Sequence, residues 1–113
     1  MIDQIRPSQL EAWFASLPAG SAPLVLDVRE PHELAIARVQ DAGVEVLAIP
    51  MGTVPVRLAE LDPERPIACL CHHGARSMQV ASFLAARGFS QIANVAGGID
   101  AWSSERDPAI ARY

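Results

Sequence analysis

Short apolar runs alternate with amphipathic segments along this 113-residue chain, and this alternation limits the possible folds more than any other feature. We expect strands at 24–28, 44–49, 66–71 and 92–95, because short apolar runs are typical of strands that are buried on both faces. Strands that alternate with helices form parallel sheets with helices packed on them. The predicted fold class is therefore α/β, with a mostly parallel central sheet of about five strands and helices on both faces.

Helices are predicted from capping residues and apolar spacing. Ser8 and Glu11 have the spacing of a capping box, which predicts a helix that begins at Ser8. Thr53 is expected to cap a second helix that runs to Leu61, with a proline in its first turn. A longer helix is expected over 75–87, where the following glycine stands in the position of a C-terminal cap.

Composition predicts one globular domain that spans residues 1–113. Half of the residues are apolar, which is enough for one core without metals or disulfide bonds. The net charge is −4 and there is no basic run, so we expect no nucleic-acid partner. The apolar stretches are shorter than the roughly 18 residues of a spanning helix, and we expect no membrane partner. Two cysteines and no secretory signal pattern predict a cytoplasmic location.

A reactive cysteine is predicted at the end of the third strand. Cys71 is followed at once by a polar, glycine-containing stretch and the start of a helix. Ligands of parallel sheets bind beyond the carboxyl ends of the strands. There, inward-pointing backbone N–H groups, the helix dipole and the charge of Arg76 would each favour a thiolate over a thiol. The same surroundings would bind a sulfur oxyanion or the outer sulfur of a persulfide.

Cys69 and the histidine pair are given other interpretations. Cys69 lies inside an apolar run and is expected to be an inert core residue. A disulfide bond between Cys69 and Cys71 is disfavoured, because alternate residues of a strand lie about 6.5 Å apart, near the upper limit for bridging. His72 and His73 have no third ligand at a useful local spacing, so we expect no metal site and no cofactor.

Four segments carry a resemblance to a known family. The segment 71–77, Cys-His-His-Gly-Ala-Arg-Ser, resembles the active-site loop of rhodanese-domain sulfurtransferases, particularly of small bacterial single-domain members. Segments 26–33, 49–51 and 94–102 are similar to further family signatures and occur in the family's order. The resemblance covers nearly the whole chain and implies a rhodanese-like fold.

The resemblance also implies a reaction. A sulfurtransferase of this family would take a sulfane sulfur from a donor such as thiosulfate or a persulfide and hold it on Cys71 as a persulfide. A thiophilic acceptor would then remove the sulfur: cyanide in the test tube, or a thiol or protein cysteine in the cell. Cys71 is thus the predicted catalytic nucleophile. The residues that the resemblance assigns to substrate binding are His72, His73, Gly74, Ala75, Arg76 and Ser77.

Other notable residues are expected to be mainly structural. Asp27 and Arg29 are expected to make polar bonds that hold loops at the end of the sheet. The pair Gly97–Gly98 predicts a tight turn and a helix start, which the resemblance places near the cysteine loop. The remaining candidates are expected to pack in the core or to be exposed at the surface: Trp13, Trp102 and His32.

The chain departs from the family pattern at two places. His72 and His73 stand where thiosulfate-using members often carry arginine or lysine. Histidine is mostly neutral at pH 7, so attraction for a dianionic donor should be weaker here and should depend on pH. The segment 37–43 lacks the histidine and glycine of the family's commoner form.

Three alternative functions remain open on the sequence. Cysteine phosphatases and arsenate reductases also bind an oxyanion in a cysteine loop, but the phosphatases have five residues between cysteine and arginine. Only four residues separate Cys71 from Arg76, and this tighter ring suits one sulfur atom better than a phosphate. The other two alternatives are a rhodanese-like binding or sulfur-carrier module without catalysis, and redox sensing through the two cysteines.

Overall fold

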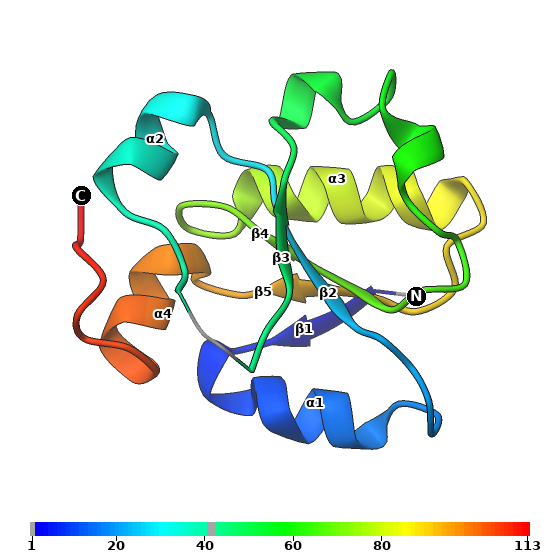
Figure 1. Cartoon of the computed structure of the whole chain (residues 1–113), viewed down its shortest axis with the longest axis horizontal. Helices are drawn as coiled ribbons and strands as arrows, with labels where there is room; N and C mark the ends of the chain where they lie inside the picture. The colour runs from blue at the N-terminus through cyan, green and yellow to red at the C-terminus, as the bar shows by residue number, and fades with distance from the viewer. Residues whose placement is uncertain (1, 41–42) are drawn as a thin grey trace.

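The computed structural model describes residues 2–40 and 43–113, and within them five strands form one central sheet (Figure 1). Every neighbouring pair is parallel, and the strand order is β1-β5-β4-β2-β3. The strands are β1 (Ile2–Ile5), β2 (Leu24–Asp27), β3 (Val46–Ala48), β4 (Ile67–Leu70) and β5 (Ile92–Val95). The predicted α/β class is confirmed. The strand β1 was not predicted, because this edge strand carries two exposed polar residues in its middle and so is not an apolar run.

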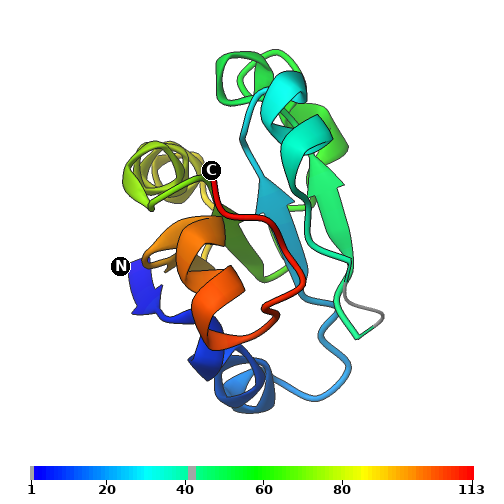
Figure 2. The ribbon, with the colours of Figure 1, turned by 90° about the vertical axis from the view of Figure 1, so that its left-hand side faces the viewer.

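Helices cover both faces of the sheet, as predicted. The helices are α1 (Leu10–Ser16), α2 (Pro31–Ile36), α3 (Ala75–Ala86) and α4 (Gly98–Glu105). In Figure 1, α3 lies above the sheet, α1 lies below it and α4 lies at its left, and Figure 2 shows the molecule after a quarter turn. Side chains of α1 and α4 share one core. No helix in the described part of the chain has both the length and the apolar character needed to cross a membrane.

Two separate cores fill the space on either side of the sheet. Successive residues of β4 belong to different cores, because successive side chains of a strand point to opposite faces. Ile67, Cys69 and, just past the strand, Cys71 belong to the α3-side core, which also contains Leu84 of α3. The opposite core contains Leu70 together with α1 and α4 side chains, including both tryptophans. Trp13 and Trp102 are therefore core residues, as expected.

The helix predicted to begin at Ser8 begins differently. Pro7 starts a 3₁₀ turn, Pro7–Gln9, so that Ser8 lies inside the turn and does not cap it. The Gln9 side chain accepts a hydrogen bond from the Arg6 backbone N–H at 2.8 Å. The Ser8 hydroxyl donates to Glu105 of α4 instead. The predicted capping box of Ser8 and Glu11 is therefore wrong, and α1 begins at Leu10.

The helix predicted over 53–61 is also absent. Two short 3₁₀ turns occupy this stretch, Met51–Thr53 and Leu58–Glu60. The Thr53 hydroxyl donates backward to the Pro50 carbonyl at 3.0 Å and does not cap a following helix. One α-type bond, from the Arg57 N–H to the Thr53 carbonyl at 3.1 Å, spans Pro55, but the bonds that follow, from Glu60 to Arg57 and from Leu61 to Leu58, are of the 3₁₀ type.

The predictions for the later elements agree better with the structure. α3 ends at Ala86, within one residue of the predicted end, and Gly88 follows it in the left-handed region with φ +93°. For the unusual segment 37–43, residues 41 and 42 lie outside the described residues. Its first part contributes Ala37 and Val39 to the core on the α1 and α4 side.

Candidate active site

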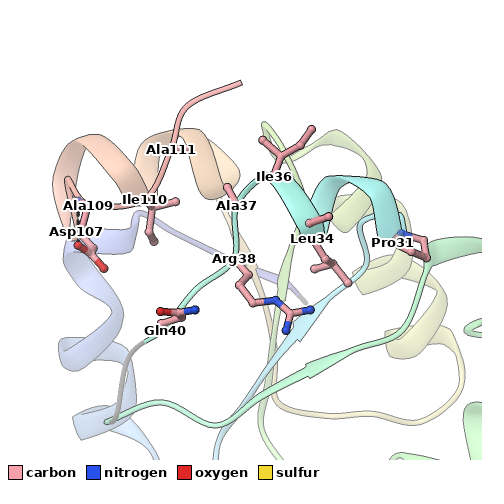
Figure 3. Close-up of a pocket in the computed structure, with 11 residues that line it drawn as sticks. Pro31, Leu34, Ile36, Ala37, Arg38, Gln40, Asp107, Ala109, Ile110 and Ala111 are labelled. Atoms are coloured by element: carbon pink, nitrogen blue, oxygen red, sulfur yellow. Dashed lines mark hydrogen bonds between the residues drawn. The ribbon is translucent and has the colours of Figure 1, made fainter.

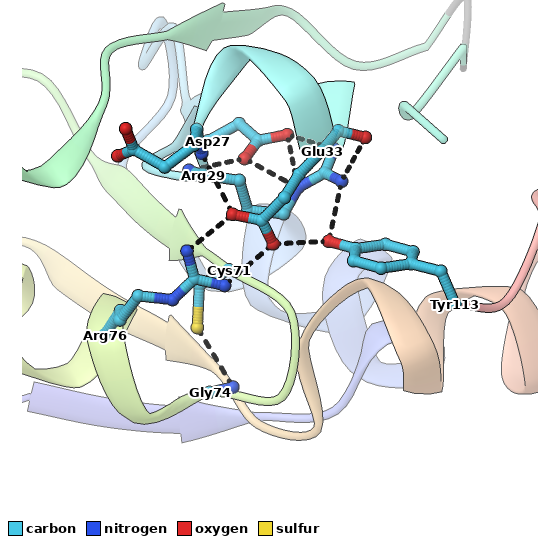
Figure 4. Close-up of polar contacts among 8 residues, drawn as sticks. Asp27, Arg29, Glu33, Cys71, Gly74, Arg76 and Tyr113 are labelled. Atoms are coloured by element: carbon cyan, nitrogen blue, oxygen red, sulfur yellow. Dashed lines mark hydrogen bonds and ion pairs between the residues drawn. The ribbon is translucent and has the colours of Figure 1, made fainter. Parts of the chain in front are cut away.

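Cys71 is the first residue after β4, at the carboxyl edge of the sheet. It begins a tight loop that leads directly into α3, and residues 71–76, called here the Cys71 loop, include the first two residues of that helix (Figure 4). The backbone N–H of Gly74 donates to Cys71 Sγ at 3.1 Å. Only 1% of the residue is exposed, so the sulfur is shielded from bulk water. The sulfur therefore lies inside a curled loop at the amino end of a helix, where an anionic sulfur would be stabilised.

Glycine is required at the turn of this loop. Gly74 has φ +112°, a left-handed conformation that residues with a side chain rarely adopt. A Cβ atom at this position would also lie 3.3 Å from the Gly97 backbone nitrogen. The sequence of the turn thus allows the Gly74 N–H to point back at the sulfur.

The amino end of α4 supports the loop from behind. The Ile99 N–H donates to the Cys71 carbonyl at 2.8 Å, and the Asp100 N–H donates to the His72 carbonyl at 3.2 Å. Gly98 makes this approach possible, because a Cβ there would lie 2.3 Å from the His72 oxygen and 2.5 Å from the Cys71 oxygen. The glycine pair therefore forms the predicted turn and helix start, and it packs against the cysteine loop as the resemblance implied.

Arg76 forms a bidentate ion pair with Glu33 of α2. Its Nη1 donates to Glu33 Oε1 at 2.6 Å and its Nη2 to Oε2 at 2.9 Å. The same carboxylate accepts the Tyr113 hydroxyl at 2.8 Å and the Glu30 N–H at 3.0 Å. The bonds from Arg76, above all, hold the pKa of Glu33 well below its usual range, and the pKa of Arg76 is raised in turn. Both groups therefore remain charged near neutral pH.

Arg29 is fully buried beside this network. Its Nε and Nη2 bind the Asp27 carboxylate at 3.0 and 2.8 Å, and its Nη1 donates to the Tyr113 hydroxyl at 3.0 Å. Burial opposes the charge of Arg29, but the bonds to Asp27 and Tyr113 outweigh it, so its pKa is raised. Asp27 and Arg29 thus make the predicted polar bonds at the end of the sheet.

Three aromatic rings stack along the outside of the loop. The His72 ring lies 3.9 Å from the Tyr113 ring at an angle of 10°, and the His73 ring lies 3.9 Å from that of His72. His72 Nε2 is buried without a hydrogen-bond partner. The tyrosine therefore contacts the loop through its ring and the Glu33–Arg76 pair through its hydroxyl.

The last two predicted site residues lie at the start of α3. Ala75 is exposed, whereas Ser77 is fully buried. The Ser77 hydroxyl donates to Asn94 Oδ1 at 2.5 Å, and the Asn94 amide donates to the Gly74 carbonyl at 3.2 Å. Through these bonds Ser77 connects the loop to β5.

Cys69 has the surroundings of a core residue. It is completely buried, and burial raises the pKa of its thiol to about 12. Both cysteines are free thiols. Within residues 2–40 and 43–113, no group of three histidine, cysteine or acidic side chains could hold a metal ion.

Glu33 and Tyr113 are the site residues that sequence reasoning missed. Glu33 follows Glu30 at the spacing of a capping box, and this signal could have indicated that its carboxylate reaches back along the chain. No local pattern identifies Tyr113, because its hydroxyl bonds to Glu33 and Arg29, which lie 80 and 84 positions away. The exposure of His32, in contrast, was predicted correctly.

A hollow of about 670 Å³ lies away from the cysteine, between α2 and residues 107–111 (Figure 3). Leu34, Ile36 and Ile110 give it apolar walls, and Arg38 and Asp107 supply charge. No residue of the Cys71 loop lines it. It is therefore not the candidate active site.

Comparison with known proteins agrees with this geometry. Residues 10–105 match the family described as Rhodanese-like domain. A sulfurtransferase of Allochromatium vinosum is 35% identical over 88 residues, which are 78% of either chain. The thiosulfate sulfurtransferase GlpE of Actinobacillus pleuropneumoniae serotype 7 is 31% identical over 97% of this chain and 94% of its own. The crystal structure of a rhodanese-like domain protein from Staphylococcus aureus superposes with a TM-score of 0.74 and 25% identity over 99% of both chains. The chain therefore belongs to the rhodanese-like domain family.

Proposed function

We propose that this protein is a sulfurtransferase that carries sulfur as a persulfide on Cys71. The observation that supports this most directly is the Cys71 sulfur inside a glycine-turned loop, with the Gly74 N–H donating to it at 3.1 Å. The relatives named as sulfurtransferases support the same reaction class.

The reaction has two half-reactions. In the first, the Cys71 thiolate attacks the outer sulfur of a donor: Cys71–S⁻ and thiosulfate (S–SO₃²⁻) give Cys71–S–S⁻ and sulfite (SO₃²⁻). A persulfide donor R–S–S⁻ would leave as the thiolate R–S⁻. In the second, an acceptor removes the outer sulfur: with cyanide the products are thiocyanate and the free Cys71 thiolate. A thiol or a protein cysteine would be the acceptor in the cell.

The Cys71 loop would stabilise the persulfide anion in this scheme. The backbone N–H groups of residues 72–76 provide the donors, and the start of α3 adds the positive end of its dipole. Arg76 would add positive potential at the bound donor, and its ion pair with Glu33 would reduce that potential. No step of the scheme requires a metal or a cofactor.

Intact-protein mass spectrometry tests the proposal. We expect incubation with thiosulfate or a low-molecular-weight persulfide to add one sulfur atom to Cys71, and cyanide to remove it with release of thiocyanate. Cys71→Ser should abolish both steps. The matched control is Cys69→Ser, which should keep most of the activity because the Cys69 thiol is buried and neutral. Sulfur transfer by the Cys71→Ser protein would contradict the mechanism.

Failure to load sulfur from any donor would favour a non-catalytic binding module. Release of phosphate from an aryl phosphate would favour the phosphatase alternative. We expect no such release, because only four residues lie between Cys71 and Arg76.

A further inference from the structure

The charge of the arginine in the Cys71 loop is cancelled by a carboxylate. Both terminal nitrogens of Arg76 bind the two oxygens of Glu33, at 2.6 and 2.9 Å, in the parallel two-bond geometry that makes such pairs strong. The Glu33 side chain is only 8% exposed, whereas that of Arg76 is 35% exposed, so solvent reaches the pair from the arginine side. Together the two side chains carry no net charge.

The neighbouring arginines are cancelled in the same way. Arg29 is paired with Asp27, and Arg112 is paired with Asp100, whose N–H holds the His72 carbonyl. The other basic side chains of the loop are His72 and His73. The paired arginines around Cys71 therefore offer an incoming donor little net positive charge.

This charge balance distinguishes between sulfur donors. When the Cys71 thiolate meets thiosulfate, three negative charges converge on the site. When it meets a donor with a single negative charge, such as a persulfide anion, only two converge. Repulsion grows with the product of the charges, so a site without net positive charge opposes the dianion more strongly.

We propose that Glu33 is a specificity-determining residue that neutralises Arg76 and so disfavours dianionic donors such as thiosulfate relative to singly charged ones. This inference rests on the proposed sulfurtransferase function. Glu33 itself does not touch the reacting sulfur in this proposal; it acts through Arg76.

The experiment compares two donors that differ in charge but deliver the same sulfur. Thiosulfate releases sulfite (2−), whereas benzenethiosulfonate, C₆H₅SO₂–S⁻, releases benzenesulfinate (1−), and both leave Cys71–S–S⁻. The measured quantity is the ratio of kcat/KM for thiosulfate to kcat/KM for benzenethiosulfonate, with cyanide as acceptor and thiocyanate as product. We expect Glu33→Gln to raise this ratio about tenfold at low ionic strength, because Arg76 then carries an uncancelled charge. The increase should shrink at high salt.

A double-mutant cycle separates charge from structure. Arg76→Gln leaves the Glu33 charge unopposed and should lower the ratio, whereas Glu33→Gln combined with Arg76→Gln restores a neutral pair and should return the ratio to the wild-type value. Tyr113→Phe is the matched control: it removes a hydrogen bond to the same carboxylate without changing charge, and the ratio should not move. Equal losses with both donors in every variant would overturn the inference and indicate a purely structural role for Glu33.

The wild-type protein provides a test that does not depend on the folding of any variant. Its donor ratio should rise with ionic strength, because salt screens the extra repulsion of the dianion. A ratio that falls with salt would show that thiosulfate is attracted by an uncancelled cation, and the inference would be wrong. If the protein transferred sulfur from neither donor, the proposed function would be wrong, and so would the inference that rests on it.

Discussion

At the scale of single residues, Glu33 has more polar contacts than its position on a short helix suggests. Its carboxylate accepts two bonds from Arg76, one from Tyr113 and one from its own helix start. Bonds of this kind to an ionised group are about twice as strong as those between neutral groups. Through these hydrogen bonds Glu33 connects α2 to α3 and to Tyr113 beside Cys71.

The network predicts a pH dependence of stability. The folded-state pKa of Glu33 lies below its ordinary value of 4.5, so its contribution is fully present above that value and is lost as the pH falls below it. We expect the free energy of unfolding of the wild type to fall more steeply between about pH 5 and pH 2 than that of Glu33→Gln. Urea titrations at a series of pH values would measure both curves.

Other carboxylates also titrate in this range, and the comparison with Glu33→Gln removes their common contribution. If the unfolding free energies of the two proteins fell in parallel as the pH is lowered, the Glu33–Arg76 pair would add nothing to stability.

At the scale of elements, the contact between α4 and the Cys71 loop decides where the thiol lies. Two backbone N–H groups of α4 hold the carbonyls of Cys71 and His72, and Gly98 leaves room for this approach. Because this helix start packs so closely against the Cys71 loop, any displacement of α4 would displace Cys71 as well.

Gly98→Ala tests this contact. The added Cβ would overlap two carbonyl oxygens and would also be strained at φ +60°, so we expect a loss of roughly 2–4 kcal/mol in unfolding free energy. We expect sulfur transfer to fall by about a hundredfold, because displacement by about 1 Å has costs of this size in active sites.

Gly88→Ala is the matched control for that substitution. Gly88 also has a positive φ, +93°, but nothing lies within 4 Å of the position that an added Cβ atom would take. It should lose only about 1–2 kcal/mol and should keep its activity. Equal activity of the two variants would contradict the role of the close approach.

At the scale of the whole molecule, the two cores are joined through the sheet that separates them. Successive residues of one strand, such as Ile67 and Ala68 of β4, belong to different cores. Loss of packing on one face therefore weakens the strands that the other face needs. We expect the chain to unfold as one cooperative domain.

Substitutions on opposite faces test this expectation. Leu10→Ala in α1 and Leu84→Ala in α3 each empty a fully buried site, and each should cost about 2–5 kcal/mol. Tryptophan fluorescence reports the core of α1 and α4, and far-ultraviolet circular dichroism reports the backbone helices. The two probes should give one shared midpoint in each variant, and separate midpoints would indicate two folding units.

Much of the fold and of the site could be predicted from the sequence, and the failures share a physical cause. The strands β2, β4 and β5 are apolar runs, and the Cys71 loop has local glycine and helix-start signals, so neighbouring residues were enough to predict them. The edge strand β1 is stabilised by pairing with β5, and the turns after Pro50 depend on packing against α3. Neither leaves a clear local pattern.

The sequence by itself determined the α/β class, the family and the position of Cys71 at the carboxyl end of a central strand, because these follow from periodicity and from contiguous motifs. Only the tertiary structure decided the partner of Arg76. Glu33 lies 43 positions from Arg76, and Tyr113 lies 80 positions from Glu33. The charge of Arg76 is cancelled only because the fold brings the start of α2, with Glu33, against it. No local pattern in the sequence predicts that contact.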